Sequence, residues 1–261
     1  MIREAAAVIL LRESGPTYEV FLLRRRKGAS FMASAFVFPG GGADEGEDAR
    51  TAAARELFEE AGVLLAKEVD EGADTLETPT QAQLRKRILG GANAAKVLEA
   101  AGLAWSTDVL VPWAHWITPS VEAKRFSARF FVTVLPAGQD PSYDDIETVE
   151  QVWVRPADAI ARAGELNLPP PQVRTFWELS SLPTIADVMA AAAKRAEEPH
   201  PIMPRLGDGA LLLPWDPEYT NAAGDASPLT YQPAWAIGPS RFIKEDGAWR
   251  HVFASTTTAS S

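Results

Sequence analysis

The residues best suited to chemistry are the acidic side chains of the segment 41–63, which reads GGADEGEDARTAAARELFEEAGV. Glu56, Glu59 and Glu60 are three and four residues apart, so on a helix they project to one side. Like charges at these spacings repel by roughly 0.2–0.5 kcal/mol per pair, and closer packing would require a cation among them. Hard carboxylate oxygens with no Cys or His nearby suit Mg²⁺ or Mn²⁺. The segment therefore predicts a divalent metal site.

Two neighbouring elements must position these carboxylates. The Ala-rich stretch 49–61 predicts a helix, and Gly62 is placed to end it. Gly40, Gly41 and Gly42 predict a loop whose backbone can come close to a metal or a phosphate group. The alternative interpretation of the acidic residues is a solvated helix face without a ligand.

The spacing of these residues resembles the Nudix box, which is a Gly, five residues, a Glu, seven residues and then REUxEExGU, where U is aliphatic. The matching positions are Gly41, Glu47, Arg55, Glu56, Leu57, Glu59, Glu60, Gly62 and Val63. The resemblance implies a hydrolase that cleaves a nucleoside diphosphate linked to another group.

The resemblance also implies roles for single residues. It implies that Arg55 pairs with Glu47, which would tie the glycine loop to the helix. It implies metal ligands at the Gly40 carbonyl and at the three helix carboxylates, with Glu60 as the principal ligand. Glu59 and Glu60 are both candidates for the catalytic base.

A further acidic residue outside the box has the spacing of a catalytic loop residue. Glu147 lies six residues before Trp153 and resembles the loop Glu of the MutT type, which binds metal or acts as a base. Glu150 and Asp145 are the alternatives for this role. For each of them, a solvated loop position is the competing interpretation.

Positive charge to meet a diphosphate comes from the run 24–27, which reads RRRK and ends a predicted strand. Arg24 and Arg25 are candidate substrate-binding residues, although alternation along a strand lets only about half of the run face the site. Arg125 is a weaker candidate. Gly41 is a fourth candidate, which would contact the substrate through its backbone. A solvated strand end explains the run equally well.

Composition limits the classes of partner. A net charge of −10 and a pI of about 4.9 argue against a nucleic-acid or anionic-membrane surface. The chain has no Cys, which excludes disulfides and thiol catalysis and fits a cytoplasmic protein. The apolar run Ala5 to Leu11 is too short to span a membrane and predicts a strand.

The expected fold is of the α+β class: the resemblance implies a Nudix α/β/α sandwich with a mixed sheet over residues 1–180. Ala-rich runs broken by glycines predict a helical insertion at about 77–101. This insertion either selects the substrate or is an inert part of the scaffold. Residues 181–254 predict a helix followed by a Pro-rich extension, packed on the domain or on a partner in a homodimer. Residues 255–261 predict a disordered tail.

Beyond the box, the order of elements resembles a longer Nudix subgroup that includes the peroxisomal coenzyme A diphosphatases. The resemblance implies cleavage of CoA or acyl-CoA. Two departures are Ser30 and Ser34, where the CoA signature of another diphosphatase branch has Arg and Gly. ADP-ribose and NADH or another dinucleotide are the alternative substrates, and a nucleotide-sensing regulator without catalysis is the alternative of another class.

Overall fold

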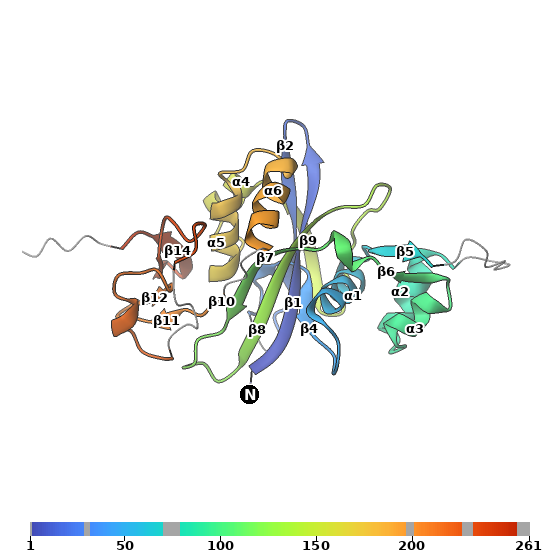
Figure 1. Cartoon of the computed structure of the whole chain (residues 1–261), viewed down its shortest axis with the longest axis horizontal. Helices are drawn as coiled ribbons and strands as arrows, with labels where there is room; N and C mark the ends of the chain where they lie inside the picture. The colour runs from blue at the N-terminus through green and yellow to red at the C-terminus, as the bar shows by residue number, and fades with distance from the viewer. Residues whose placement is uncertain (1, 29–31, 70–78, 197–200, 226–231, 255–261) are drawn as a thin grey trace, which may run out of the picture.

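The chain is built around a mixed β-sheet. The computed structural model describes residues 2–28, 32–69, 79–196, 201–225 and 232–254. Eight strands pair in the order β10-β7-β8-β1-β2-β3, with β4 on β1 and β9 on β2 (Figure 1). Their bounds are β1 Ile2–Ser14, β2 Thr17–Arg25, β3 Phe36–Val37, β4 Gly40–Gly42, β7 Val111–Ile117, β8 Arg125–Val134, β9 Thr148–Val154 and β10 Pro201–Ile202. The β1–β8 and β10–β7 pairs are parallel and the other pairs are antiparallel.

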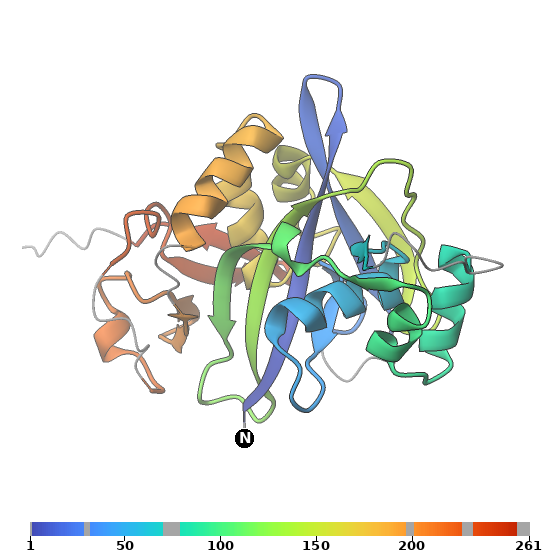
Figure 2. The same cartoon turned by 45° about the vertical axis from the view of Figure 1, so that its right-hand side comes forward.

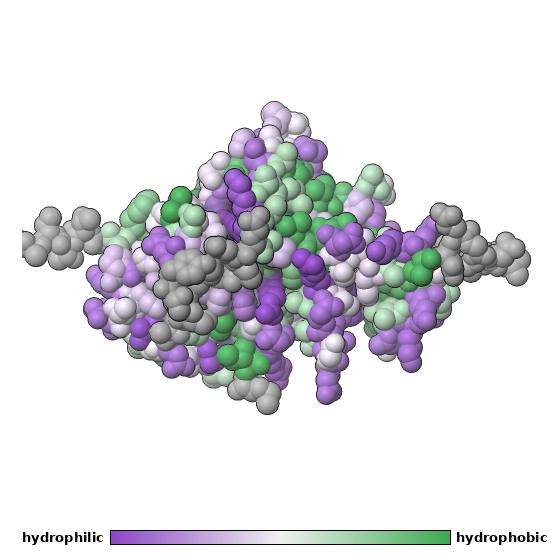
Figure 3. All heavy atoms as spheres, in the orientation of Figure 1, coloured by the Kyte–Doolittle hydropathy of each residue, from purple (hydrophilic) through white to green (hydrophobic). Residues whose placement is uncertain are grey.

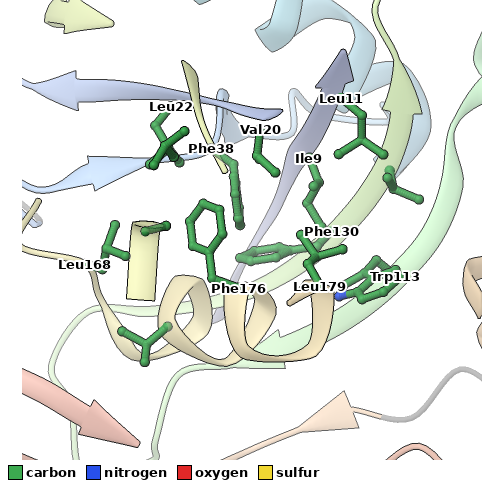
Figure 4. Packing of buried hydrophobic residues seen from close by; sticks show 14 of the residues in the cluster. Ile9, Leu11, Val20, Leu22, Phe38, Trp113, Phe130, Leu168, Phe176 and Leu179 are labelled. Atoms are coloured by element: carbon green, nitrogen blue, oxygen red, sulfur yellow. The ribbon is translucent and has the colours of Figure 1, made fainter. Parts of the chain in front are cut away.

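The central strand β1 is buried on both faces. Ile9 and Leu11 point into one hydrophobic cluster and Val8 and Leu10 into another. A strand covered on both sides reads as a continuous apolar run, which explains the uninterrupted stretch at residues 5–11. Figure 4 shows part of the first cluster, in which Ile9 of β1 faces Phe130 and the covering helix that carries Phe176 and Leu179.

Helices cover both faces of the sheet. Helix α1, Ala49–Ala61, packs on one face, and α4 Pro156–Ala161, α5 Pro170–Leu179 and α6 Ile185–Ala196 lie on the other (Figures 1 and 2). This arrangement confirms the predicted α/β/α sandwich with a mixed sheet. Because α6 packs on β7 in the same layer as α5, the predicted boundary at residue 180 falls inside that layer.

The predicted insertion contains two helices, α2 Gln81–Leu89 and α3 Ala94–Glu99, which pack on Phe58 of α1. They are flanked by a two-stranded sheet of β5 Ala66–Glu68 and β6 Leu103–Trp105, followed by the short 3-10 turn η1 Thr107–Val109. The Asn93 side chain caps the start of α3 by accepting a hydrogen bond from the Lys96 backbone N–H. Residues 77–78 of the predicted insertion are outside the described ranges.

The C-terminal extension forms a separate antiparallel sheet at the left of Figure 1. Its elements are β11 Arg205–Leu206, β12 Ala210–Leu212, the 3-10 turn η2 Tyr219–Asn221, β13 Arg241–Glu245 and β14 Ala248–Val252. Arg174 of α5, which is 1% exposed, donates to the carbonyls of Ile237 at 2.9 Å and Pro239 at 3.2 Å. These buried contacts attach the extension to the helix layer. The predicted disordered tail, 255–261, lies outside the described residues.

The exterior is rich in polar side chains. Hydrophilic residues cover much of the face seen in Figure 3. In the described ranges, no helix combines the length and the apolar character needed to cross a bilayer.

Candidate active site

Helix α1 is fixed at both ends by local signals. The Asp48 carboxylate accepts hydrogen bonds from the backbone N–H of Arg50 at 2.9 Å and of Thr51 at 3.2 Å. At the other end Gly62, which the sequence predicted to end the helix, has a left-handed φ of 69° and donates to the Phe58 carbonyl. Since the Ala-rich face packs on the sheet, the acidic side chains gather on the remaining side, beside the glycine segment.

Arg55 is the centre of an ion-pair network in which its side chain is only 9% exposed. Its Nε lies 3.0 Å from Glu47 Oε1 and its Nη2 lies 2.8 Å from Glu47 Oε2, a bidentate pair. Its Nη1 contacts Glu56 Oε1 at 3.0 Å and Glu59 Oε2 at 3.2 Å. Its Nη2 also donates to the Gly42 carbonyl at 2.8 Å. Arg55 therefore ties the loop, the glycine segment and two carboxylates together.

The glycines lie in a short strand, β4, and not wholly in a loop as the sequence predicted. A Cβ at Gly40 would lie 2.3 Å from the Ala6 carbonyl oxygen, and a Cβ at Gly41 would lie 2.5 Å from the Glu56 carboxylate. The Gly40 N–H donates to Glu60 Oε2 at 2.8 Å. The missing side chains thus let the backbone pair with β1 and approach two carboxylates at once.

Burial perturbs the three helix carboxyls. Burial, opposed by the Gly40 N–H and aided by the charge of Glu56, raises the pKa of Glu60 to about 8. Burial also raises the pKa of Glu56 to about 7, against the opposing charge of Arg55. Burial raises the pKa of Glu59 as well, again against Arg55. Without a cation, Glu60 therefore holds a proton at neutral pH, which marks the cluster as a functional-site candidate.

Glu147 lies in the loop before β9. The Asp144 carboxylate shapes this loop by accepting from the backbone N–H groups of Ile146 at 2.9 Å and Glu147 at 3.1 Å. Burial is the main cause of the raised pKa values of Glu56 and Glu60, and the negative charge of Glu147 adds a small part to both.

The two alternatives to Glu147 pair with arginines of the basic run. Glu150 forms an ion pair with Arg24 at 2.9 Å, and Asp145 contacts Arg26 at 3.5 Å. Of the three predicted loop acids, Glu147 is the one whose charge acts on Glu56 and Glu60. Its catalytic role stays a prediction.

The basic candidates separate in space. Burial raises the pKa of Glu60 and the positive charge of Arg25 opposes this rise in part, whereas Arg24 pairs with Glu150. Arg125 donates to the Thr118 carbonyl at 3.1 Å. In the sheet it pairs with Ile2, five residues along β1 from the Ala7–Gly40 pair, or about 16 Å at 3.3 Å per residue. Arg125 therefore lies apart from the cluster, and of the two arginines of β2 Arg25 is the one whose charge acts on Glu60.

Arg85 of α2 was missed by sequence reasoning. Its Nε and Nη2 donate to the Glu59 carbonyl at 3.0 and 2.8 Å, and its Nη1 contacts Ser142 Oγ at 3.0 Å. The available signal was its position between Leu84 and Ile88, which are buried, so that it falls toward the inner side of an otherwise polar helix. A pocket of about 600 Å³ adjoins Arg85 and is lined by α2, Gly62 and the loop 138–144; none of the three helix carboxylates lines it.

The site offers the oxygen donors that a hard divalent cation prefers, but its side chains are not yet arranged around one ion. Buried carboxylates with raised pKa values and a nearby backbone carbonyl are an oxygen donor set of the kind that Mg²⁺ and Mn²⁺ prefer. Within the described ranges, no three Asp, Glu or His side chains are already arranged to hold one ion. The contacts of Arg55 with Glu56 and Glu59, and of Gly40 with Glu60, account for this arrangement.

Comparison with known proteins supports the family at several levels. A family model described as the NUDIX domain matches residues 1–93. "Putative nudix hydrolase 7" of Caenorhabditis elegans is 34% identical over 194 residues, which cover 71% of this chain and 62% of that protein. The chain thus spans less than two thirds of that relative. "Acyl-coenzyme A diphosphatase NUDT19" of Xenopus laevis is 24% identical over 285 residues, covering 78% of this chain and 73% of that protein.

A solved structure agrees with these relatives. The crystal structure of a NUDIX hydrolase from Alicyclobacillus acidocaldarius has a TM-score of 0.64 and 27% identity, and covers 73% of this chain and 96% of that chain. The shared fold, the complete box on α1 and its ion-pair network lead to one conclusion. Residues 1–93 match the NUDIX domain, and the chain is similar in sequence and fold to Nudix hydrolases.

Proposed function

We propose that the chain is a Mg²⁺- or Mn²⁺-dependent pyrophosphohydrolase that cleaves the diphosphate of a nucleoside diphosphate derivative, with CoA or acyl-CoA as the favoured substrate. The observation that carries the proposal is the cluster of Glu60, which is buried, and Glu56 and Glu59, which are partly buried; all three have raised pKa values and lie beside the Gly40–Gly41 backbone. Crowding three carboxyl groups, one buried and two partly buried, would destabilise the fold if they had no catalytic or binding role.

In this proposal the three helix carboxylates, Glu147 and the Gly40 carbonyl hold the metal. When bound, Mg²⁺ or Mn²⁺ neutralises phosphate oxygens and lowers the pKa of a bound water. Glu59 and Glu60 are both candidates to accept the proton of the attacking water. Arg55 keeps the carboxylates in place, and Arg25 and the backbone of Gly41 bind the diphosphate.

The CoA preference rests on similarity to relatives named as acyl-coenzyme A diphosphatases. Water would attack one phosphorus, break the P–O–P bond and release 3′-phosphoadenosine 5′-phosphate and a phosphopantetheine or its acyl form. ADP-ribose and NADH are the alternative substrates. The cytoplasmic location and the homodimer remain predictions from the sequence.

A substrate panel tests the proposal. The purified chain is incubated with Mg²⁺ or Mn²⁺ and CoA, butyryl-CoA, ADP-ribose or NADH, and products are separated by chromatography. We expect 3′,5′-ADP from the CoA substrates and a loss of about 100-fold or more in rate for Glu60→Gln. Glu99→Gln, an exposed carboxylate of α3, is the matched control and should keep the wild-type rate. Tight nucleotide binding without any product would favour the non-catalytic regulator instead.

A further inference from the structure

Arg85 joins three parts of the molecule that are far apart in the sequence. Its guanidinium contacts the Glu59 carbonyl of α1 twice, and it contacts both the hydroxyl of Ser142 at 3.0 Å and the carbonyl of Ser142 at 2.9 Å. It projects from α2, the first helix of the insertion. Its Nη1 would lie 2.8 Å from a Cβ added at Gly62, so the guanidinium lies directly against the cap of α1.

The carbonyl end of α1 depends on such contacts from outside the helix. A helix leaves its last four carbonyls without partners within the helix, and positive charge is favourable there. The last turn of α1 has no basic residue of its own. Arg85 donates to the Glu59 carbonyl, the Ser142 N–H donates to the Ala61 carbonyl at 2.9 Å, and Gln81 Nε2 donates to the Gly62 carbonyl at 2.6 Å. The insertion and the following loop therefore complete the end of the box helix.

The same contacts fix the loop that carries Glu147. Ser142 is held at its hydroxyl and carbonyl by Arg85 and at its N–H by Ala61. Two residues later the Asp144 carboxylate accepts from the N–H groups of Glu147 at 3.1 Å and Thr148 at 3.0 Å. Hydrogen bonds thus hold the loop at Ser142 and again at Glu147, the residue whose charge adds to the raised pKa values of Glu56 and Glu60.

We propose that Arg85 is a positioning residue that holds the Glu147 loop against the end of α1, so that the insertion is part of the active site. The proposal rests on the proposed function, because it assigns Arg85 to the site that would hydrolyse the diphosphate. Each of its three guanidinium nitrogens is already bonded to protein oxygens, which fits a positioning role better than contact with substrate.

The test compares Arg85→Gln with Arg87→Gln, an exposed arginine two residues along the same helix. Amide hydrogen exchange should rise at least tenfold in a peptide spanning 138–148 of Arg85→Gln and stay at the wild-type rate in Arg87→Gln. With the best substrate of the panel, kcat should fall about 10- to 100-fold while KM changes less than twofold, because small misplacement of catalytic groups acts on the chemical step. Arg85→Lys, which replaces the planar fork by a single ammonium group, should give intermediate values.

Three results would overturn the inference. They are an unchanged kcat in folded Arg85→Gln, an unchanged exchange rate in the loop, and a raised KM at constant kcat, which would make Arg85 a substrate ligand. If Arg85→Gln does not fold, the Lys variant decides, and wild-type kcat and exchange there would contradict the inference. Hydrogen exchange needs no substrate. If the wild type is inert on the whole panel, the proposed function is refuted, and the exchange experiment still tests the contact between Arg85 and the loop.

Discussion

Replacing Arg55 by Gln should destabilise the fold far more than the loss of an ordinary surface ion pair. The Arg55 side chain is 9% exposed, and that of its bidentate partner Glu47 is 11% exposed. Glu56 and Glu59, which also contact Arg55, are 13% and 24% exposed. Removing one partner of a buried ion pair costs about 3–5 kcal/mol, because the other charge stays buried. Since these carboxylates can still reach some water, we expect a cost near the lower end, about 3 kcal/mol.

The assay is urea unfolding at pH 7 in the presence of a chelator, so that no metal compensates for the lost charge. Arg12→Gln is the control, because Arg12 contacts Glu19 at 2.7 Å but the two side chains are 39% and 19% exposed. That variant should lose at most about 1 kcal/mol. Equal losses for the two variants would refute the claim that Arg55 is the electrostatic centre of the site.

Three further predictions concern single positions. Gly41→Ala should lower kcat at least about tenfold in the substrate assay, because the new Cβ would lie 2.5 Å from the Glu56 carboxylate and displace it. Arg25→Gln should lower kcat/KM roughly 10- to 100-fold, as expected for losing a charged hydrogen bond, whereas Arg24→Gln should leave it nearly unchanged; equal effects would contradict the assigned geometry. Burial, aided by the charge of Arg129, lowers the pKa of His115 from 6.5 to about 4. Its contribution to stability is therefore complete above pH 6.5 and is lost as the pH falls toward 4. Thermal unfolding between pH 7 and 5 should show a loss of at most about 2 kcal/mol that His115→Gln removes.

Local patterns in the sequence were sufficient to predict the box helix. Both ends of 49–61 follow from neighbouring residues, since Asp48 caps the start and Gly62 takes the left-handed conformation at the end. The buried strands were predicted for the same reason: β1 and β2 are long apolar or alternating runs. The strand β4 was not predicted, because glycine disfavours strands and only the approach of Ala6 and Ala7 of β1 explains it.

Contacts between distant segments could not be predicted from the sequence. The charge run at 24–27 did not reveal which arginine faces the site, because a register shift between Arg24 and Arg25 interrupts the alternation of β2. Arg85 carries no motif, and its importance arises only when α2 folds onto the end of α1 and meets Ser142. The local pattern thus predicts the acidic face, and the tertiary structure determines its basic partners.

The most direct test of the central claim is the anomalous scattering of Mn²⁺ in crystals grown with the ion. The account predicts a peak among the carboxylates of Glu56, Glu59 and Glu60 and the Gly40 carbonyl, and its loss in Glu60→Gln crystals. Crystals at saturating Mn²⁺ that show no peak there, with Glu56 and Glu59 still bound to Arg55, would contradict it.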